Sequence, residues 1–496
     1  NKENFHFFLF FFAVALCGYA SVLTSHCPYN DDYVRLMMNN TCGVYGRYGD
    51  VILEYIMFLS HIVLDASPFT HIVSCGILAF TALICVRIFC KTQTPDRYCL
   101  MFFVPIILNP YIVSDMIFIF DNIFMMSALL CTVLSAYIST GDNSRSIPLQ
   151  VILLLSGLMF YQAALSACFI IFLYILIDKI SAGEKLSNLL KTVKNQIYTM
   201  ACTAILYLPI ACGINYCKRE KKIFEGSSLP EYLEFVQRKI FYYFENIYSD
   251  WKDAYVGAIV SLFIIGFIIS FFVKTWKNRS NYRDCIVRGI FLTVLIFAFF
   301  LAPIGVTAFF NHAGSEGSEN VPPRIIYTLG IVISAVMYDS SFFFKKIYLF
   351  RSVYKIFSLI FVVWNVVFAN ATGNLLKQQC KLQDDISRSM AEDLYDLQKE
   401  GNNISKIKFS NYKFAAPAIL RAKQEYPILE RILIPQWGNP IFSDVLSKYN
   451  GHFFPHVCDI HTENPETKNA KKIVDRMWYT LRLLEDNTLV VEMKKP

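Results

Sequence analysis

Long apolar stretches separated by short polar loops fill the first three quarters of the chain. Each stretch is long enough to cross a hydrocarbon core of about 30 Å, so the pattern predicts about eleven membrane-spanning helices. We expect these spans at residues 5–23, 69–90, 98–110, 121–139, 149–160, 162–177, 195–214, 255–273, 289–310, 324–343 and 352–370. No small-residue cleavage site follows the first span, which we therefore expect to be retained. Between 149 and 177, Tyr161-Gln162 is the polar break that divides one apolar run into two short helices.

Composition agrees with a polytopic α-helical membrane protein. The chain is 55% hydrophobic and only 17% charged, whereas soluble domains are about 25% charged. The net charge of +7 lies in short loops between spans and does not indicate a nucleic-acid partner. Basic residues gather in four loops, near Lys91, Lys185, Lys274 and Lys345. These loops share one side in the predicted topology, which the positive-inside rule makes the cytoplasm.

The last quarter of the chain has the charge density of a soluble protein. We therefore divide the sequence into a membrane domain, 1–371, and a small α/β domain, 372–496, on the outer side of the membrane. Helices are expected at Lys381–Lys399 and at Ala415–Ile432, the second ended or kinked by Pro427. The turn residues Glu485-Asp486-Asn487 between two apolar runs predict a terminal β-hairpin.

Two segments on the outer side show helical amphipathicity. Glu54, His61 and Asp65 share one face of a helix over Val51–Leu64, which favours a helix lying in the membrane interface with its polar face in water. A metal-binding or catalytic role for that face is the alternative. Leu229–Trp251 is interpreted as a second interfacial helix. No cysteine or histidine spacing typical of a metal site occurs, so a divalent metal stays open as a cofactor without a ligand motif to support it.

The first outer loop, 24–68, carries the residues best suited to chemistry. Asp31 and Asp32 are adjacent carboxylates just beyond the first span. Either can serve as the general base that deprotonates an attacking hydroxyl, and a phosphate leaving group needs no second, acidic carboxyl. The alternative is that both cap a helix or are simply solvated.

Three arginines near the outer membrane edge are suited to phosphate, because guanidinium binds phosphate oxygens through two parallel hydrogen bonds. Arg35 and Arg47 lie in loop 24–68, and Arg324 follows Pro322-Pro323 at the outer start of a span, where a cation is disfavoured. Interfacial snorkelling is the other explanation for Arg35 and Arg47. Asn109-Pro110-Tyr111, Asp115 and Asp121-Asn122 cluster at the same edge, where turning the chain is the first interpretation and sugar binding by Asp121 the second.

Six short motifs occur in an order that resembles the bacterial type II glucosyltransferase family. They are Asn-Asp-Asp-Tyr-x-Arg at 30–35, Gly-Arg at 46–47, Asn-Pro-Tyr at 109–111, Phe-Asp at 120–121, Tyr-Gln at 161–162 and Pro-Arg at 323–324. That family comprises the serotype-converting O-antigen glucosyltransferases, which act with a flippase and a separate lipid-glucose synthase. The similarity covers roughly 1–370. The family in turn resembles the GT-C superfamily, in which the first outer loop holds an acidic base and the donors are polyprenyl-phosphate sugars.

The resemblance implies an inverting glucosyltransferase of the bacterial inner membrane, with its active site and C-terminus in the periplasm. The expected reaction moves glucose from undecaprenyl-phosphate glucose to a hydroxyl of lipid-linked O-antigen, which modifies the lipopolysaccharide. An O-antigen polymerase or ligase and a lipid-linked sugar flippase are the alternatives. The implied roles are a base at Asp31 or Asp32, donor phosphate binding at Arg35, Arg47 and Arg324, and sugar or acceptor contacts at Tyr33, Asp121, Tyr161 and Gln162.

Two cysteines of the first outer loop stand on either side of its acidic pair. Because the periplasm is oxidising, we expect a disulfide between Cys27 and Cys42 that holds the loop in place. Two free thiols are the alternative.

Overall fold

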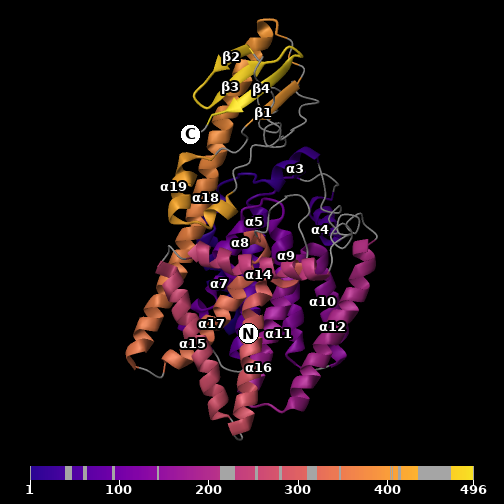
Figure 1. The fold of residues 1–496 in the computed structure, drawn as a ribbon, viewed down its shortest axis with the longest axis vertical. Coiled ribbons are helices and arrows are strands. Elements are labelled where there is room, and N and C mark those ends of the chain that lie inside the picture. The colour runs from indigo at the N-terminus through magenta and orange to yellow at the C-terminus, as the bar shows by residue number, and fades with distance from the viewer. Residues whose placement is uncertain are drawn as a thin grey trace.

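The computed structural model describes residues 2–38, 47–59, 64–91, 95–141, 144–212, 229–251, 255–278, 282–309, 321–345, 348–402, 404, 406–410, 415–433 and 471–494. Within them the chain forms a helical bundle from which one long helix extends, with a small sheet at its far end (Figure 1). The α-helices are α1 Lys2–Gly18, α2 Ala20–Leu23, α3 Asp31–Met38, α4 Tyr48–Phe58, α5 Phe69–Cys90, α6 Arg97–Met101, α7 Val104–Ile107, α8 Pro110–Met116, α9 Asn122–Ser139, α10 Ile147–Phe160, α11 Leu165–Ser181, α12 Leu186–Cys212, α14 Leu229–Trp251, α15 Tyr255–Lys277, α16 Tyr282–Leu301, α17 Leu329–Phe344, α18 Tyr348–Lys399, α19 Pro417–Glu425 and α20 Leu429–Ile432. Short 3-10 helices lie at Ser144–Ser146 (η2), Gln162–Ala164 (η3), Ala302–Phe309 (η4) and Pro323–Ile325 (η5).

Every predicted span overlaps a helix, and six helical segments among the described residues are long and apolar enough to cross a membrane. They are Phe69–Cys90, Asn122–Ser139, Gln162–Ser181, Tyr255–Lys277, Cys285–Gly305 and Arg351–Lys399. A bent pair, Tyr98–Ile107 with Pro110–Met116, is a seventh candidate and turns by 51° at its break. Helices α10 and α17 are apolar but shorter. The chain is thus a mostly helical protein with several candidate spans, and the count of about eleven stays a prediction.

Exposed apolar side chains mark the surface that lipid would cover. On α16, Ile290, Phe291, Val294 and Phe297 are each more than half exposed. Large patches of this kind are rare on soluble monomers. At one end of the bundle, Lys91 after α5 and Lys274 on α15 both pair with Asp178 of α11. Three of the four basic loops therefore begin at neighbouring helix ends, as predicted.

Helix α18 is 52 residues long and passes through the predicted domain boundary at 371–372 without a break. The polar helix expected at Lys381–Lys399 is therefore its continuation and not a separate element. Gly373 allows α18 to lie close to α2, since a Cβ there would be 2.4 Å from the Ser21 Oγ and 2.7 Å from the Val22 backbone nitrogen. The sequence changes from apolar to polar where α18 leaves the bundle, but no residue there ends a helix.

The far end of α18 carries a four-stranded sheet in the order β1-β4-β3-β2. The strands are β1 Lys406–Ser410, β2 Lys471–Asp475, β3 Tyr479–Leu483 and β4 Thr488–Met493. Strands β3 and β4 form the predicted hairpin, with Asn487 in the left-handed region at φ 63°. Their buried side chains, including Leu481 and Val491, join Met390 and Leu394 of α18 in one small core. As predicted, α19 ends before Pro427.

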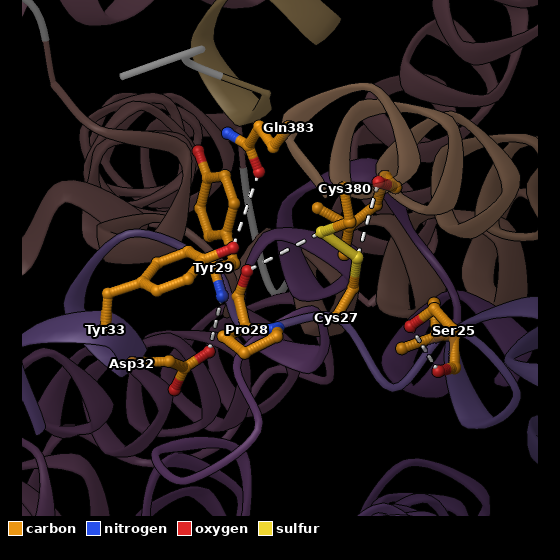
Figure 2. Close-up of a disulfide and its surroundings, with 10 residues drawn as sticks. Ser25, Cys27, Pro28, Tyr29, Asp32, Tyr33, Cys380 and Gln383 are labelled. Carbon is orange, nitrogen blue, oxygen red and sulfur yellow. Dashed lines mark hydrogen bonds between the residues drawn. A yellow bond between two sulfur atoms is a disulfide. The ribbon is translucent and has the colours of Figure 1, made fainter. Parts of the chain in front are cut away.

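A disulfide joins the first outer loop to α18, but its partners differ from those predicted. Cys27 pairs with Cys380, with 6.2 Å between the two Cα atoms (Figure 2). The predicted pairing with Cys42 is wrong for Cys27, and Cys42 itself lies outside the described residues. Spacing along the loop could not reveal this, because α18 brings Cys380 to the loop from 353 residues away.

We predict that a non-reduced digest of the purified protein contains Cys27 and Cys380 in one linked peptide. Replacing Cys380 with serine should lower the thermal midpoint by an amount corresponding to about 2–4 kcal/mol, a typical range for one disulfide. Cys202→Ser, which removes an exposed free thiol, is the control and should leave the midpoint unchanged. Recovery of Cys27 linked to Cys42, or as a free thiol, would contradict the pairing.

Candidate active site

The predicted site residues gather at the end of the bundle from which α18 extends, around α3, α4, α8 and the start of α9 (Figure 1). The centre of this region is the Arg35 guanidinium, which is only 5% exposed. Its Nη1 lies 2.6 Å from a carboxylate oxygen of Glu54, and its Nη2 lies 2.6 Å from a carboxylate oxygen of Asp121. Arg35 therefore connects α3, α4 and the residue that precedes α9, three segments that are separate in sequence.

Glu54 is buried, whereas the sequence predicted that it would face water. We expected a polar face in water, but Glu54 is 4% exposed, whereas Ile52, Tyr55 and Ile56 of the same helix are more than half exposed. The helix thus turns its carboxylate inward, because the buried Arg35 cation needs partners. Of the other two residues predicted on that face, Asp65 accepts from Ser67 in an exposed turn, and His61 lies outside the described residues.

Arg47 lies close to the same cluster, at the start of α4. Its Nη1 is 3.9 Å from Asp121, and its guanidinium carbon is 4.8 Å from the centre of the Tyr161 ring. Gly49 allows the start of α4 to approach α10 closely, since a Cβ at Gly49 would lie 2.7 Å from the Phe160 ring at the end of α10. The glycine therefore allows α4 to begin directly against the break between α10 and α11.

A second set of contacts leads from Tyr161 to Asp31. The Tyr161 hydroxyl donates to the backbone carbonyl of Arg324 at 3.3 Å. The Arg324 Nη1 lies 3.0 Å from a carboxylate oxygen of Asp31, with the Arg324 side chain 37% and the Asp31 side chain 48% exposed. Glu54, Arg35, Asp121, Arg47, Tyr161, Arg324 and Asp31 thus form one continuous series of neighbours.

The two adjacent carboxylates have different environments. Asp32 is fully buried and accepts hydrogen bonds from three backbone amides, those of Tyr29 at 2.9 Å, Ile119 at 3.0 Å and Phe120 at 3.3 Å. Burial raises the pKa of Asp32 to about 8, and the three amide donors act in the opposite direction. Asp31, by contrast, is half exposed. The geometry therefore leaves Asp31 as the carboxylate that a substrate can reach.

Two of the predicted sugar contacts lie at the edges of this region. Tyr33 is buried, and its hydroxyl donates to Gln383 of α18 at 3.4 Å (Figure 2). Gln162 donates to the hydroxyl of Tyr207 on α12 at 3.0 Å. Neither joins the series above, so their roles stay predictions.

Asn109 turns the chain as predicted, because its side chain accepts from the amides of Tyr111 and Ile112 and so caps α8. Two further carboxyl groups are buried at the site: Asp50, which the sequence analysis did not single out, and Asp115, which it named only in a cluster interpreted as turning the chain. Asp50 and Asp115 are both fully buried, and their carboxylate oxygens accept no hydrogen bond from the part of the chain that the structure describes. For Asp50, the spacing to Glu54 of one helical turn is a signal that could have found it. Within the described residues, no three histidine, cysteine or carboxylate side chains are arranged to hold a metal ion.

We predict a pH-dependent contribution of Asp32 to stability. Its pKa is about 8 in the folded protein and about 4 in an unfolded chain, so between these values the folded state binds one more proton. The free energy of unfolding should therefore fall as pH rises through this window, by at most about 1.4 kcal/mol per unit, and level off above pH 8.

Thermal midpoints measured from pH 5 to pH 9 check this. The Asp32→Asn variant lacks the titration, so the wild type should lose stability relative to this variant as pH rises from 5 to 8. Asp65→Asn, which changes an exposed carboxylate, is the control. A difference that stays constant across the whole range would rule out the shifted pKa.

Comparison with known proteins gives one match. A protein-family model described as Glucosyl transferase GtrII matches residues 20–335. No match was found among curated proteins or among solved structures. The matched stretch contains all the residues of the series from Glu54 to Asp31 and ends before α18 and the sheet. Since the match spans well over half of the chain and agrees with the motifs in the sequence, the protein belongs to the GtrII glucosyl transferase family.

Proposed function

We propose that this protein transfers glucose from undecaprenyl-phosphate glucose to a sugar hydroxyl of lipid-linked O-antigen, and so modifies the O-antigen. Membership in the glucosyl transferase family supports the transferred sugar and the reaction class. The observation that carries the mechanism is the half-exposed Asp31 carboxylate, 3.0 Å from the partly exposed Arg324 guanidinium. A base and a cation suited to phosphate are thus both accessible at one point.

The reaction is a single displacement with inversion at the anomeric carbon. An acceptor hydroxyl forms a bond to that carbon while the bond from the carbon to the phosphate oxygen breaks. Asp31 takes the hydroxyl proton, a step that typically contributes about 10²–10⁴-fold to the rate. The electron pair leaves with the lipid phosphate, whose charge needs a cation and not an acid.

Arg324 and Arg47 are suited to that phosphate. Guanidinium presents five N–H donors, and the ion pair with Asp31 involves one nitrogen of Arg324. Arg35, which we also expected at the phosphate, is buried and held by two carboxylates. We therefore propose a positioning role for Arg35 and assign the donor phosphate to the other two arginines.

The basic residues at one end of the bundle support the proposed orientation of the protein in the membrane. Lys91, Lys274 and Asp178 meet at the end that the positive-inside rule assigns to the cytoplasm. The site, the outer half of α18 and the sheet would then be periplasmic, where a flippase delivers the lipid-linked glucose. The stretch of α18 around Cys380 and Gln383 contacts the loop that carries Asp31, and we propose that it contacts the acceptor.

We predict that Asp31→Asn lowers turnover by at least about 100-fold, a change of about 2.7 kcal/mol in the barrier, without lowering the thermal midpoint. Arg324→Lys keeps the charge but loses the planar fork, so it should mainly raise the KM for the lipid donor. Asp65→Asn, another exposed carboxylate of the same loop, is the matched control. The assay is transfer from purified lipid-linked glucose to isolated acceptor. Normal turnover in Asp31→Asn would mean that the base is elsewhere.

A topology test addresses the proposed location. Alkaline phosphatase is active only outside the cytoplasm, so a fusion after Pro496 should be active and one after Lys191 inactive. Both fusions must be present in the membrane in similar amounts, as shown by immunoblotting. The opposite pattern would place the site in the cytoplasm, where a flippase delivers no donor, and would contradict the proposed location.

A further inference from the structure

Three breaks between helices meet beside Arg324 and Tyr161. The first lies in the bent pair that ends in α8, the second is the extended break at Tyr161 between α10 and α11, and the third is η5 with the turn that precedes α17. Contacts join α8 to η5 and η3 to η4, and the Ser166 and Thr328 hydroxyls are 2.9 Å apart. Breaks of this kind free backbone at membrane depth, which is tolerated only inside protein or at a cavity and marks substrate sites in many transporters.

Two side chains at this meeting point carry polar atoms with no hydrogen-bond partner among the described residues. Both carboxylate oxygens of Asp115, on α8, and the hydroxyl of Tyr327, just before α17, are fully buried and unpaired. Helix α8, which carries Asp115, contacts α17, which begins just after Tyr327. The Tyr327 ring packs 5.8 Å from that of Tyr161.

Leaving such groups unpaired is costly. A buried donor or acceptor without a partner costs about 1–3 kcal/mol, and more when it is charged, so native proteins contain few of them. A carboxylate and a hydroxyl together match a ligand that offers several hydroxyl groups, because the carboxylate accepts and the phenol can do either. A hexose is a ligand of this chemistry.

The position of Asp115 and Tyr327 near the arginines agrees with a hexose that is linked to a phosphate. Helix α8, which carries Asp115, contacts η5, which carries Arg324. The Tyr161 ring is 4.8 Å from the Arg47 guanidinium carbon and 5.8 Å from the Tyr327 ring. In a phosphate-linked glucose the sugar ring is joined to the phosphate through a single oxygen. A phosphate held by these arginines therefore places its sugar within a few ångströms, where hydroxyl-binding groups are needed.

We propose that Asp115 and Tyr327 form the subsite that binds hydroxyl groups of the donor's glucose. This inference rests on the proposed function, because it takes the arginines as ligands of the donor phosphate. It assigns sugar recognition to two residues below the catalytic loop, one layer further into the bundle than Asp31. The base on α3 and the sugar-binding groups on α8 and just before α17 thus come from segments that are far apart in the sequence.

The test uses the full-length protein in vesicles, with undecaprenyl-phosphate glucose and its four monodeoxyglucose analogues as donors. Asp115→Asn should lower kcat/KM for the glucosyl donor by about 10- to 100-fold, and Tyr327→Phe by about 3- to 10-fold. The wild type should also discriminate against at least one deoxy donor by a similar factor. In the variant that lacks the side chain bound by that sugar hydroxyl, the discrimination should disappear, because the hydroxyl of the normal donor no longer has a partner.

Two control variants separate sugar contact from general damage. Asp339→Asn neutralises another buried carboxyl near the opposite end of the bundle, and Tyr243→Phe removes a buried hydroxyl that donates to the Phe300 carbonyl. Both should leave the discrimination among the five donors unchanged. Thermal midpoints show which variants fold. If Asp115→Asn does not fold, the donor discrimination of Tyr327→Phe tests the proposal.

The outcomes distinguish this inference from the function on which it rests. If the wild type does not use the glucosyl donor, the proposed function fails before any variant is compared. If the wild type is active but both variants keep its kcat/KM, or lose the same factor with all five donors, Asp115 and Tyr327 do not touch the sugar.

Discussion

The ion pairs of the buried Arg35 guanidinium are the interaction on which the end of the bundle nearest the extension of α18 depends. The two carboxylate partners of Arg35 come from α4 and from the start of α9, each 2.6 Å away. Removing one partner of a buried ion pair typically costs about 3–5 kcal/mol, because the remaining charge is left uncompensated. Arg35 thus ties α3 both to α4 and to the segment before α9. Asp121, held by Arg35, in turn places Arg47, and so the order of the site follows from one cation.

The acidic pair on α3 is divided by the geometry of a helix. Successive residues point about 100° apart, so Asp31 need not point inward with Asp32, and its side chain is 48% exposed. Asp32 then joins three backbone amides and ties α3 to the segment before α9. Asp31 is left half exposed beside Arg324. A residue that holds the loop and a residue that can perform chemistry are therefore adjacent in sequence without sharing an environment.

The part of the chain beyond the family match is fastened firmly to this loop. Besides the Cys27–Cys380 disulfide, the Tyr29 hydroxyl donates to the carbonyl of Ile432 at 2.5 Å. Arg431 reaches across to Asp250 at the end of α14, at 2.6 Å. The outer half of α18 and α20 consequently form a wall beside the site.

The sequence by itself determined the apolar helices, the clustering of basic loops, the terminal hairpin and the family, because hydrophobic runs, turn residues and short motifs are local signals. Only the tertiary structure decided which acid is accessible, that Glu54 is buried and that Cys27 pairs with Cys380. Each of these depends on a partner far away in the chain, as Glu54 depends on Arg35 and Cys27 on α18. A carboxylate or a thiol has the same sequence signature whether it faces water or a partner, and the free energy of burying it is set by what the fold places beside it.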